Sequence, residues 1–289
     1  EVQIVSDTNG NHLHFFEREC SIQRRYQKIV EESPSVALSD DLREKICDTA
    51  TLITKEIDYR GAGTVEFILD EDGQFYFLEM NTRLQVEHPI TEMVTGVDLV
   101  NYQIRVANGE SLEIAQNEIF QRGHSIEVRI YAEDPENNFF PTTGVVLRVG
   151  EQKRPGVRLD TGIKNGDEVG VNFDPMVAKL ITFAPTRSLC IEKMRNAITD
   201  FPFLGLKTNR EYLHKVLSNE HFLKGETYTN FVEENKDILN YDIPDNHYAI
   251  AALSHALGQK NTNSQVIAGA TNKIKSATED FYGFRNQDL

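Results

Sequence analysis

Apolar residues recur every three to four positions between residues 40 and 57, and this spacing predicts an amphipathic helix. Ser39 precedes the first turn, where a hydroxyl can accept a hydrogen bond from a free backbone N–H. Asp40 and Asp41 complement the positive end of the helix dipole. The apolar stripe consists of Leu42, Ile46, Ala50, Ile53 and Ile57.

Other segments alternate or run together in apolar residues and predict strands. Residues 1–5 and 12–16 flank the turn residues Asn9-Gly10, which are typical of a hairpin. A polar segment follows over residues 17–32, and further strands are expected at 64–69, 74–79, 124–131, 144–149, 157–160 and 177–183. Helical patterns cover 91–107, ending near Asn108-Gly109, then 187–200 and 208–218. Strands and helices do not alternate strictly, so the predicted fold class is α+β.

The pattern of residue types changes beyond about residue 235. Residues 240–246 are typical of a linker, a helical pattern runs over 247–258, and a polar stretch follows. The first residues already form a strand pattern without an initiator methionine, which indicates a cut through a longer protein.

Composition excludes several classes of partner. There are 30 basic and 45 acidic residues, for a net charge of −15, and no basic stripe, so we expect no nucleic acid and no membrane surface as the main partner. No apolar run approaches the length of a membrane span. The three cysteines, Cys20, Cys47 and Cys190, lack CxxC spacing, which favours a reducing compartment, buried inert thiols and no zinc site.

Two glutamates are expected to face each other in a hairpin. A two-residue turn at Asp72-Gly73 pairs Glu66 with Glu79. Facing carboxylates destabilise a sheet unless positive charge lies between them, and Mg²⁺ or Mn²⁺ would supply it. This arrangement favours nucleotide-dependent phosphoryl transfer. The alternatives are a solvated pair of glutamates or a shifted register.

Polar residues continue at every second position after Glu79. The row is Glu79, Asn81, Arg83, Gln85 and Glu87, which share one face if the segment is a strand. Such a strand spans ~27 Å, so its two ends would serve different parts of a site. Arg83 offers a planar fork for an oxyanion, and Glu87 offers a carboxylate that can accept a proton. The alternative is an ordinary amphipathic edge strand.

Residues 60–67 and 79–89 together resemble biotin carboxylase, an ATP-grasp enzyme. Similar motifs lie at 23–28, 122–127, Arg158 and 173–180, so the resemblance covers about residues 1–235. The triplet E-x-N-x-R also occurs in carbamoyl-phosphate synthetases, whereas Gln85-Val86-Glu87-His88 favours biotin carboxylase.

The resemblance implies a set of site residues and their roles. Metal and triphosphate are assigned to Glu66, Glu79 and Asn81, ATP to Gln23, Tyr26 and Lys28, bicarbonate to Arg83, Gln85, the Val86 backbone and Glu87, and biotin to Arg158. It further implies that Glu87 is the base that readies bicarbonate to attack ATP and form carboxyphosphate. Arg83 would stabilise the biotin enolate. Tyr26 stands where many family members carry His, and His88 is assigned a structural hydrogen bond rather than catalysis.

The resemblance also implies domains and partners. The expected domains are the C-terminal part of an ATP-grasp domain (1–122), the biotin carboxylase C-terminal domain (123–235), and a linker that starts a subunit-interaction segment (236–289). The expected protein is the α-subunit of an acyl-CoA carboxylase, with a biotin carrier domain, a carboxyltransferase β-subunit and a second copy as partners, in the cytoplasm or the mitochondrial matrix. The N-terminal ATP-site segment would be missing, which leaves the fragment inactive by itself.

Two kinds of alternative remain at this stage, another ATP-grasp enzyme and a noncatalytic module. Pyruvate carboxylase, urea carboxylase and other ATP-grasp ligases share parts of these motifs. A noncatalytic assembly or dimerisation module would be expected to carry damaged metal or bicarbonate residues, and none of those residues is damaged here. The acyl-CoA acceptor is not specified by any motif.

Overall fold

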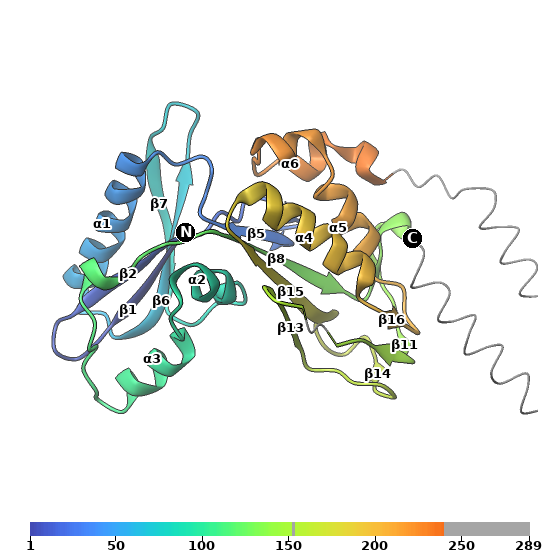
Figure 1. Cartoon of the computed structure of the whole chain (residues 1–289), viewed down its shortest axis with the longest axis horizontal. Helices are drawn as coiled ribbons and strands as arrows, with labels where there is room; N and C mark the ends of the chain where they lie inside the picture. Colours follow the sequence, from blue (N-terminus) through green and yellow to red (C-terminus); the bar gives the residue numbers. More distant parts are fainter. Residues whose placement is uncertain (152–153, 240–289) are drawn as a thin grey trace, which may run out of the picture. The chain divides into compact units, whose positions relative to one another are not determined.

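Two antiparallel four-stranded sheets form the framework of the computed structural model, which describes residues 1–151 and 154–239 (Figure 1). The first sheet has the order β2-β1-β6-β7, formed by His12–Glu17, Val2–Ser6, Gly61–Leu69 and Phe75–Asn81. The second has the order β13-β15-β8-β5, formed by Val157–Thr161, Met176–Ala184, His124–Tyr131 and Val30–Ser33. Residues Glu1–Ile238 belong to one compact unit.

Helices cover both faces of the first sheet. Helix α1 (Asp40–Glu56) packs on β1 and β2 with a core that includes Ile4 and Ile46, while α3 (Leu99–Ala107) packs on β1 and β6 with a core that includes Val5 and Leu99. Successive residues of β1 point to opposite faces, and both faces are covered. All five residues of β1 are therefore buried.

Helix α2 (His88–Thr95) connects the two sheets. It contacts β2 of the first sheet and β5, β8 and β15 of the second, and Figure 1 shows it beside both. Helix α4 (Arg187–Asp200) also packs on β8 and β15. The residues that precede α2 are consequently held where the two sheets meet.

Short elements complete the described part of the chain. The paired short strands are β3 with β4 (Gln23–Arg24, Gln27–Lys28), β9 with β10 (Glu133–Asp134, Phe140–Pro141), β11 with β14 (Gly144–Val145, Glu168–Val169), and β12 with β16 (Arg148–Val149, Phe203–Leu204). The remaining helices are α5 (Arg210–Val216), α6 (Glu220–Lys224), α7 (Phe231–Glu234) and the 3₁₀ helices η1 (Gln116–Glu118), η2 (Pro135–Asn137) and η3 (Lys236–Leu239). None of the helices in these ranges is long and apolar enough to cross a membrane.

Several predicted elements are confirmed. Helix α1 begins after Ser39, whose hydroxyl accepts a hydrogen bond from the Leu42 N–H at 3.3 Å. Strands lie at the predicted places around the hairpins and in the second sheet, and α4 covers the predicted residues 187–200. The antiparallel sheets with packed helices confirm the α+β class.

Other predictions are wrong. The pattern over 91–107 is two helices, because Gly96 adopts a left-handed φ of 75° that ends α2, and the Asp98 side chain caps α3. The polar segment 17–32 leads into the buried strand β5, which was not predicted because its two glutamates make its sequence polar. The predicted strand 144–149 is two short strands. The predicted linker and helix after residue 239 lie outside the described residues, and the domain boundaries stay predictions.

Candidate active site

Glu66 and Glu79 are register partners on strands β6 and β7. The predicted pairing is therefore confirmed, although the predicted turn is wrong. Asp70 and Gln74 close a three-residue loop, in which Gly73 has a φ of +77°. A register shift between Glu66 and Phe67 leaves Leu78 as the extra residue of a β-bulge. The three-residue loop moves the register by one residue, and the bulge moves it back.

Asn81 lies between the two carboxylates. Its Nδ2 donates to Glu79 Oε1 at 3.0 Å and to Glu66 Oε1 at 3.2 Å. Two carboxylates and an amide carbonyl offer the hard oxygen ligands that Mg²⁺ or Mn²⁺ prefers. The donors at this position therefore fit a divalent cation, with the amide nitrogen placed where positive charge is needed.

The chain turns after Asn81, so the prediction of a continuous extended row to Glu87 is wrong. Strand β7 ends at Asn81, the chain bends at Arg83, and a turn at Val86 and Glu87 leads into α2. Gln85 Nε2 donates to Glu66 Oε1 at 2.9 Å. The predicted metal and bicarbonate residues consequently share one site instead of lying ~27 Å apart.

Lys28 joins carboxylates from three parts of the chain. Its ammonium donates to Glu87 Oε1 at 2.7 Å, to Glu66 Oε1 at 2.9 Å and to Glu1 Oε2. Burial by itself lowers the pKa of Lys28, but the surrounding anionic groups raise it above its ordinary value. Lys28 is thus a fixed positive charge at the centre of the site.

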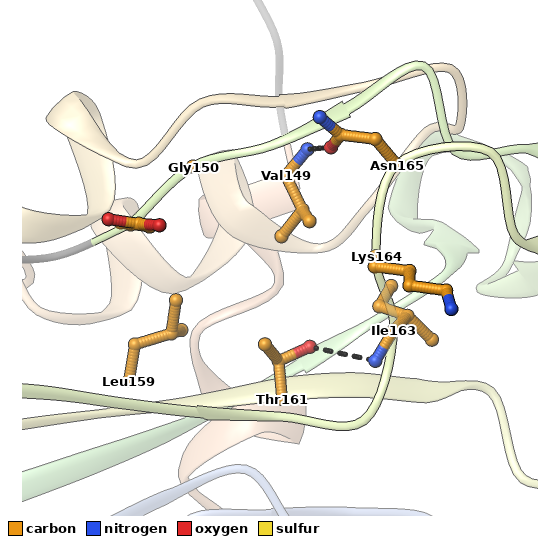
Figure 2. A pocket seen from close by; sticks show the side chains of 8 residues that line it. Val149, Gly150, Leu159, Thr161, Ile163, Lys164 and Asn165 are labelled. Carbon is orange, nitrogen blue, oxygen red and sulfur yellow. Dashed lines mark hydrogen bonds between the residues drawn. The ribbon is translucent and has the colours of Figure 1, made fainter.

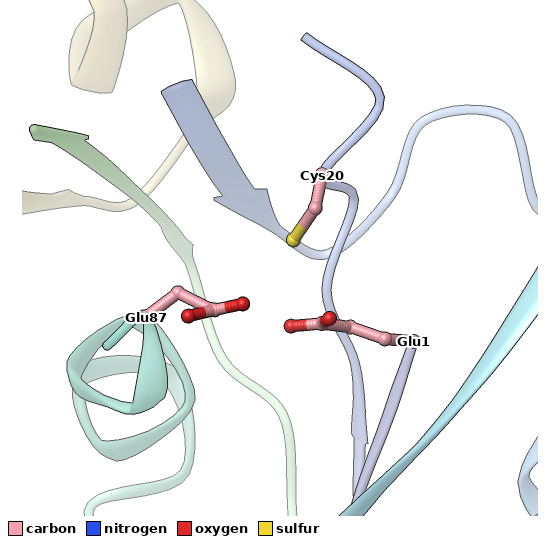
Figure 3. A group of neighbouring side chains, drawn as sticks. All are labelled: Glu1, Cys20 and Glu87. Carbon is pink, nitrogen blue, oxygen red and sulfur yellow. The ribbon is translucent and has the colours of Figure 1, made fainter. Parts of the chain in front are cut away.

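Glu1, Cys20 and Glu87 form a further cluster, in which the two carboxylates point toward each other and the thiol lies above them (Figure 3). Burial raises the pKa of the Cys20 thiol well above its usual value. Since Lys28 contacts both glutamates, their charges are already compensated. As a residue Cys20 is half-buried, whereas Cys47 and Cys190 are buried.

Glu87 is held by two cations at the start of α2. Lys28 contacts its Oε1, and Arg129 Nη2 on β8 donates to its Oε2 at 3.0 Å. Only 2% of Glu87 is exposed. On the preceding residue, the Val86 carbonyl oxygen accepts a hydrogen bond from Lys179 Nζ at 2.5 Å. These contacts hold the carboxylate in one orientation.

The remaining predicted residues differ in how closely they approach this centre. Arg83 is exposed and donates to Asn81 Oδ1 at 3.2 Å. Arg158 on β13 makes two hydrogen bonds to Asp160 and one of 2.8 Å to Glu92 on α2. Gln23 donates to the Cys20 carbonyl at 3.1 Å, whereas the Tyr26 side chain is fully open to solvent. His88 Nδ1 lies 2.7 Å from the Gln85 carbonyl oxygen, in line with its structural assignment.

Sequence reasoning missed four charged residues here: Glu1, Arg18, Glu31 and Arg129. Each is buried or half-buried, and each comes from a strand or from its flanking residues. The available signal was a charge inside an apolar strand pattern, as in Val30-Glu31 and Val128-Arg129, because charged residues are rarely buried without partners.

A separate pocket lies on the other side of β13 (Figure 2). Leu159 and Thr161 line it, and they alternate along the strand with Arg158 and Asp160, which face α2. Asn165 Oδ1 accepts a hydrogen bond from the Val149 N–H at 2.7 Å across this pocket (Figure 2). It contains none of the predicted site residues.

Two family models match the chain. Residues 1–115 match the ATP-binding domain of the carbamoyl-phosphate synthase L chain, and residues 127–234 match the biotin carboxylase C-terminal domain. The mitochondrial methylcrotonoyl-CoA carboxylase subunit alpha of Rattus norvegicus is 43% identical over 268 residues, which are 91% of this chain and 38% of that protein. The biotin carboxylase of Halalkalibacterium halodurans is 50% identical over 232 residues, covering 80% of this chain and 51% of that protein.

Solved structures of biotin carboxylase domains are also similar to this chain. The biotin carboxylase domain of the 2-oxoglutarate carboxylase of Hydrogenobacter thermophilus, solved with MgADP, ADP and bicarbonate, has a TM-score of 0.82 and 42% identity, covering 84% of this chain and 53% of that one. The chain thus spans about half the length of the biotin carboxylases it matches and 38% of the methylcrotonoyl-CoA carboxylase subunit. The chain is thus similar, over most of its length and with an ATP-grasp fold, to about half of a biotin carboxylase.

Proposed function

We propose that this chain supplies the metal, bicarbonate and biotin residues of a biotin carboxylase, which carboxylates biotin on a carrier domain with ATP and bicarbonate. The observation that carries the proposal is the position of Glu87. Its carboxylate lies at the start of α2, is oriented by Lys28 and Arg129, and follows Arg83 and Gln85 on a turn that closes onto Glu66.

The chemistry follows from these positions. Glu87 accepts the bicarbonate proton, and the freed oxygen attacks the γ-phosphorus of ATP while the bond to the ADP oxygen breaks, which yields carboxyphosphate. Arg83 provides a fork for the bicarbonate oxygens. A divalent cation held by Glu66, Glu79 and Asn81 would neutralise phosphate charge.

The second half-reaction uses the arginines. Carboxyphosphate breaks into CO₂ and phosphate, the phosphate takes the ureido proton of biotin, and the resulting nitrogen attacks CO₂. Arg83 stabilises the enolate oxygen, and Arg158 holds the biotin ring. Asp160 and Glu92 fix the Arg158 guanidinium beside α2, which supports this assignment.

Partners and compartment belong to the same proposal. We infer an acyl-CoA carboxylase α-subunit that works with a biotin carrier domain, a carboxyltransferase subunit and a second copy of itself, because the similar methylcrotonoyl-CoA carboxylase subunits are alpha subunits and one similar structure is a domain dimer. The cytoplasm and the mitochondrial matrix both remain compatible, since the relatives include a mitochondrial subunit and bacterial biotin carboxylases.

The test is ATP hydrolysis that depends on bicarbonate and biotin, measured with Mg²⁺ on the complete carboxylase that contains this chain. We expect Glu87→Gln and Arg83→Ala each to lower biotin-dependent turnover by about 10²-fold or more, because each removes a group that acts in the transition state. If biotin does not change the rate of ATP hydrolysis by the intact wild-type protein, the proposal is wrong and another ATP-grasp ligase is favoured.

A further inference from the structure

The short hairpin of β3 and β4 carries two of the residues assigned to ATP. Its strands pair at two positions, one of which joins Gln23 to Lys28. A two-stranded hairpin by itself is at best marginally stable in water. Lys28 nevertheless has to meet Glu66 and Glu87, which come from other elements. The position of Lys28 therefore depends on what holds the hairpin.

A buried ion pair fastens the hairpin to β9. Arg24 Nη2 donates to Oε1 and Oε2 of Glu133 at 2.7 Å and 2.6 Å, and the two side chains are 7% and 5% exposed. The Arg24 guanidinium also lies over the Phe139 ring, 4.3 Å from its centroid, and this ring packs edge to face with the Tyr212 ring of α5. A buried charge is costly without its partner, so Arg24 and Glu133 each depend on the other.

The tip of the hairpin makes a second connection to the same region. Arg25 and Tyr26 at the tip have positive φ angles of 50° and 66°, and so do Asn138 and Phe139 between β9 and β10, at 49° and 55°. Residues other than glycine rarely adopt this conformation, and it persists only where the surrounding structure fixes it. Arg25 Nη2 donates to the Asn138 carbonyl oxygen at 3.2 Å and to Asn138 Oδ1 at 2.9 Å. The two strained turns thus contact each other directly.

These contacts connect the two matched parts of the chain. The hairpin lies within residues 1–115, whereas β9 and the turn after it lie within residues 127–234. The turn after β9 is itself anchored, because Lys207 pairs with Asp134 and Glu136. Helix α7 also contacts β3. The C-terminal part of the chain therefore supports an element of the ATP-binding part.

We propose that Arg24 and Glu133 are positioning residues, which fix the β3–β4 hairpin and so set where Gln23 and Lys28 meet ATP. This inference rests on the proposed function and on the assignment of Gln23 and Lys28 to the nucleotide. Within the described part of the chain, neither Arg24 nor Glu133 forms a hydrogen bond or an ion pair with Glu87. Their effect on the site therefore passes through the hairpin.

The first experiment measures amide hydrogen exchange of the complete carboxylase by mass spectrometry, without substrates. Arg24→Met and Glu133→Gln each break the buried pair, so the amides of residues 22–29 should exchange at least about 10-fold faster. The double variant Arg24→Met/Glu133→Leu leaves no unpaired charge and serves where a single variant fails to fold. Arg43→Met is the matched control, because Arg43 pairs with the buried Glu17 on the first sheet. Wild-type exchange of residues 22–29 in the single and double variants would show that the proposal is wrong.

The second experiment measures steady-state kinetics of the same variants. KM for ATP should rise about 5-fold or more in Arg24→Met and Glu133→Gln while KM for biotin stays near wild type, because the hairpin carries nucleotide contacts. Arg24→Lys keeps the charge and should restore part of the loss. The double variant should show no larger rise than either single variant, since the two residues act as a unit. Arg43→Met should keep both KM values.

The two experiments separate this inference from the proposed function. Faster exchange of residues 22–29 with an unchanged KM for ATP would overturn the proposal, because the pair would then support the hairpin without positioning the nucleotide. Hydrogen exchange needs no turnover. If the exchange results are as expected but biotin does not change the rate of ATP hydrolysis, the support of the hairpin stands and only the proposed function is refuted.

Discussion

The guanidinium of Arg18 lies 2.8 Å from Oε1 of Gln85 and ties the end of β2 to the turn that carries Glu87. Arg18 has no exposed side-chain area and also donates to Glu1, Gln3, Thr64 and Thr91. Gln85 in turn donates to Glu66. The orientation of the metal and bicarbonate residues therefore depends on a buried arginine that contacts neither of the facing glutamates directly.

Removing Arg18 should destabilise the whole first sheet. Arg18→Met removes the donor to Glu1 Oε1 and to buried side-chain oxygens of Gln3, Thr64, Thr91 and Gln85, so we expect the free energy of unfolding to fall by about 3–5 kcal/mol. Urea denaturation of the 289-residue chain measures this loss. Arg105→Ala, which removes a surface ion pair with Glu110 and Glu113, should cost far less. Equal losses in the two variants would contradict the assignment.

The facing glutamates should govern the metal requirement. Glu66→Gln or Glu79→Gln removes one hard anionic ligand, so the Mg²⁺ concentration for half-maximal turnover of the complete carboxylase should rise by about 10-fold or more. Glu71→Gln, at the exposed tip of the same hairpin, is the control and should leave the Mg²⁺ dependence unchanged. Wild-type Mg²⁺ dependence in Glu66→Gln and Glu79→Gln would place the cation elsewhere.

The orientation of the Arg158 guanidinium, and with it biotin binding, should depend on Asp160 and Glu92. Asp160→Asn weakens a bidentate contact that orients the guanidinium, so KM for biotin should rise several-fold while the bicarbonate dependence stays near wild type. Steady-state kinetics with free biotin measures both. A change in the bicarbonate dependence alone would indicate that Arg158 serves the other half-reaction.

Asp7 should make stability depend on pH. Burial by itself raises its pKa, but hydrogen bonds from Asn11, Leu112 and Asn9 lower it from 3.8 to about 2. A lowered pKa contributes stability that is present above the unfolded value and is lost as the pH falls toward 2. Asp7→Asn should therefore destabilise the chain by about 2 kcal/mol at pH 7, and the difference from wild type should shrink below pH 4. Thermal unfolding across this range is the measurement, and a difference independent of pH would exclude the charge as its cause.

Elements whose causes are local can be predicted from the order of residues alone. The three-to-four spacing and Ser39 specify α1, and apolar patterns specify the strands of both sheets except β5. The order of residues also determined the pairing of Glu66 with Glu79, although through a turn and a bulge that cancel each other. The residues from Glu79 to Glu87 were recognisable because their chemistry is concentrated in one short segment.

How these residues meet depends on the folding of the whole chain. The bend after Asn81 brings Glu87 back to Glu66, and Lys28, Arg18 and Arg129 arrive there from strands far away in the sequence. Local patterns cannot show such contacts, because a buried charge is stable only when partners from other elements surround it. Glu31 and Glu127 illustrate the point, since only the register between β5 and β8 places the two carboxyl groups opposite each other without solvent.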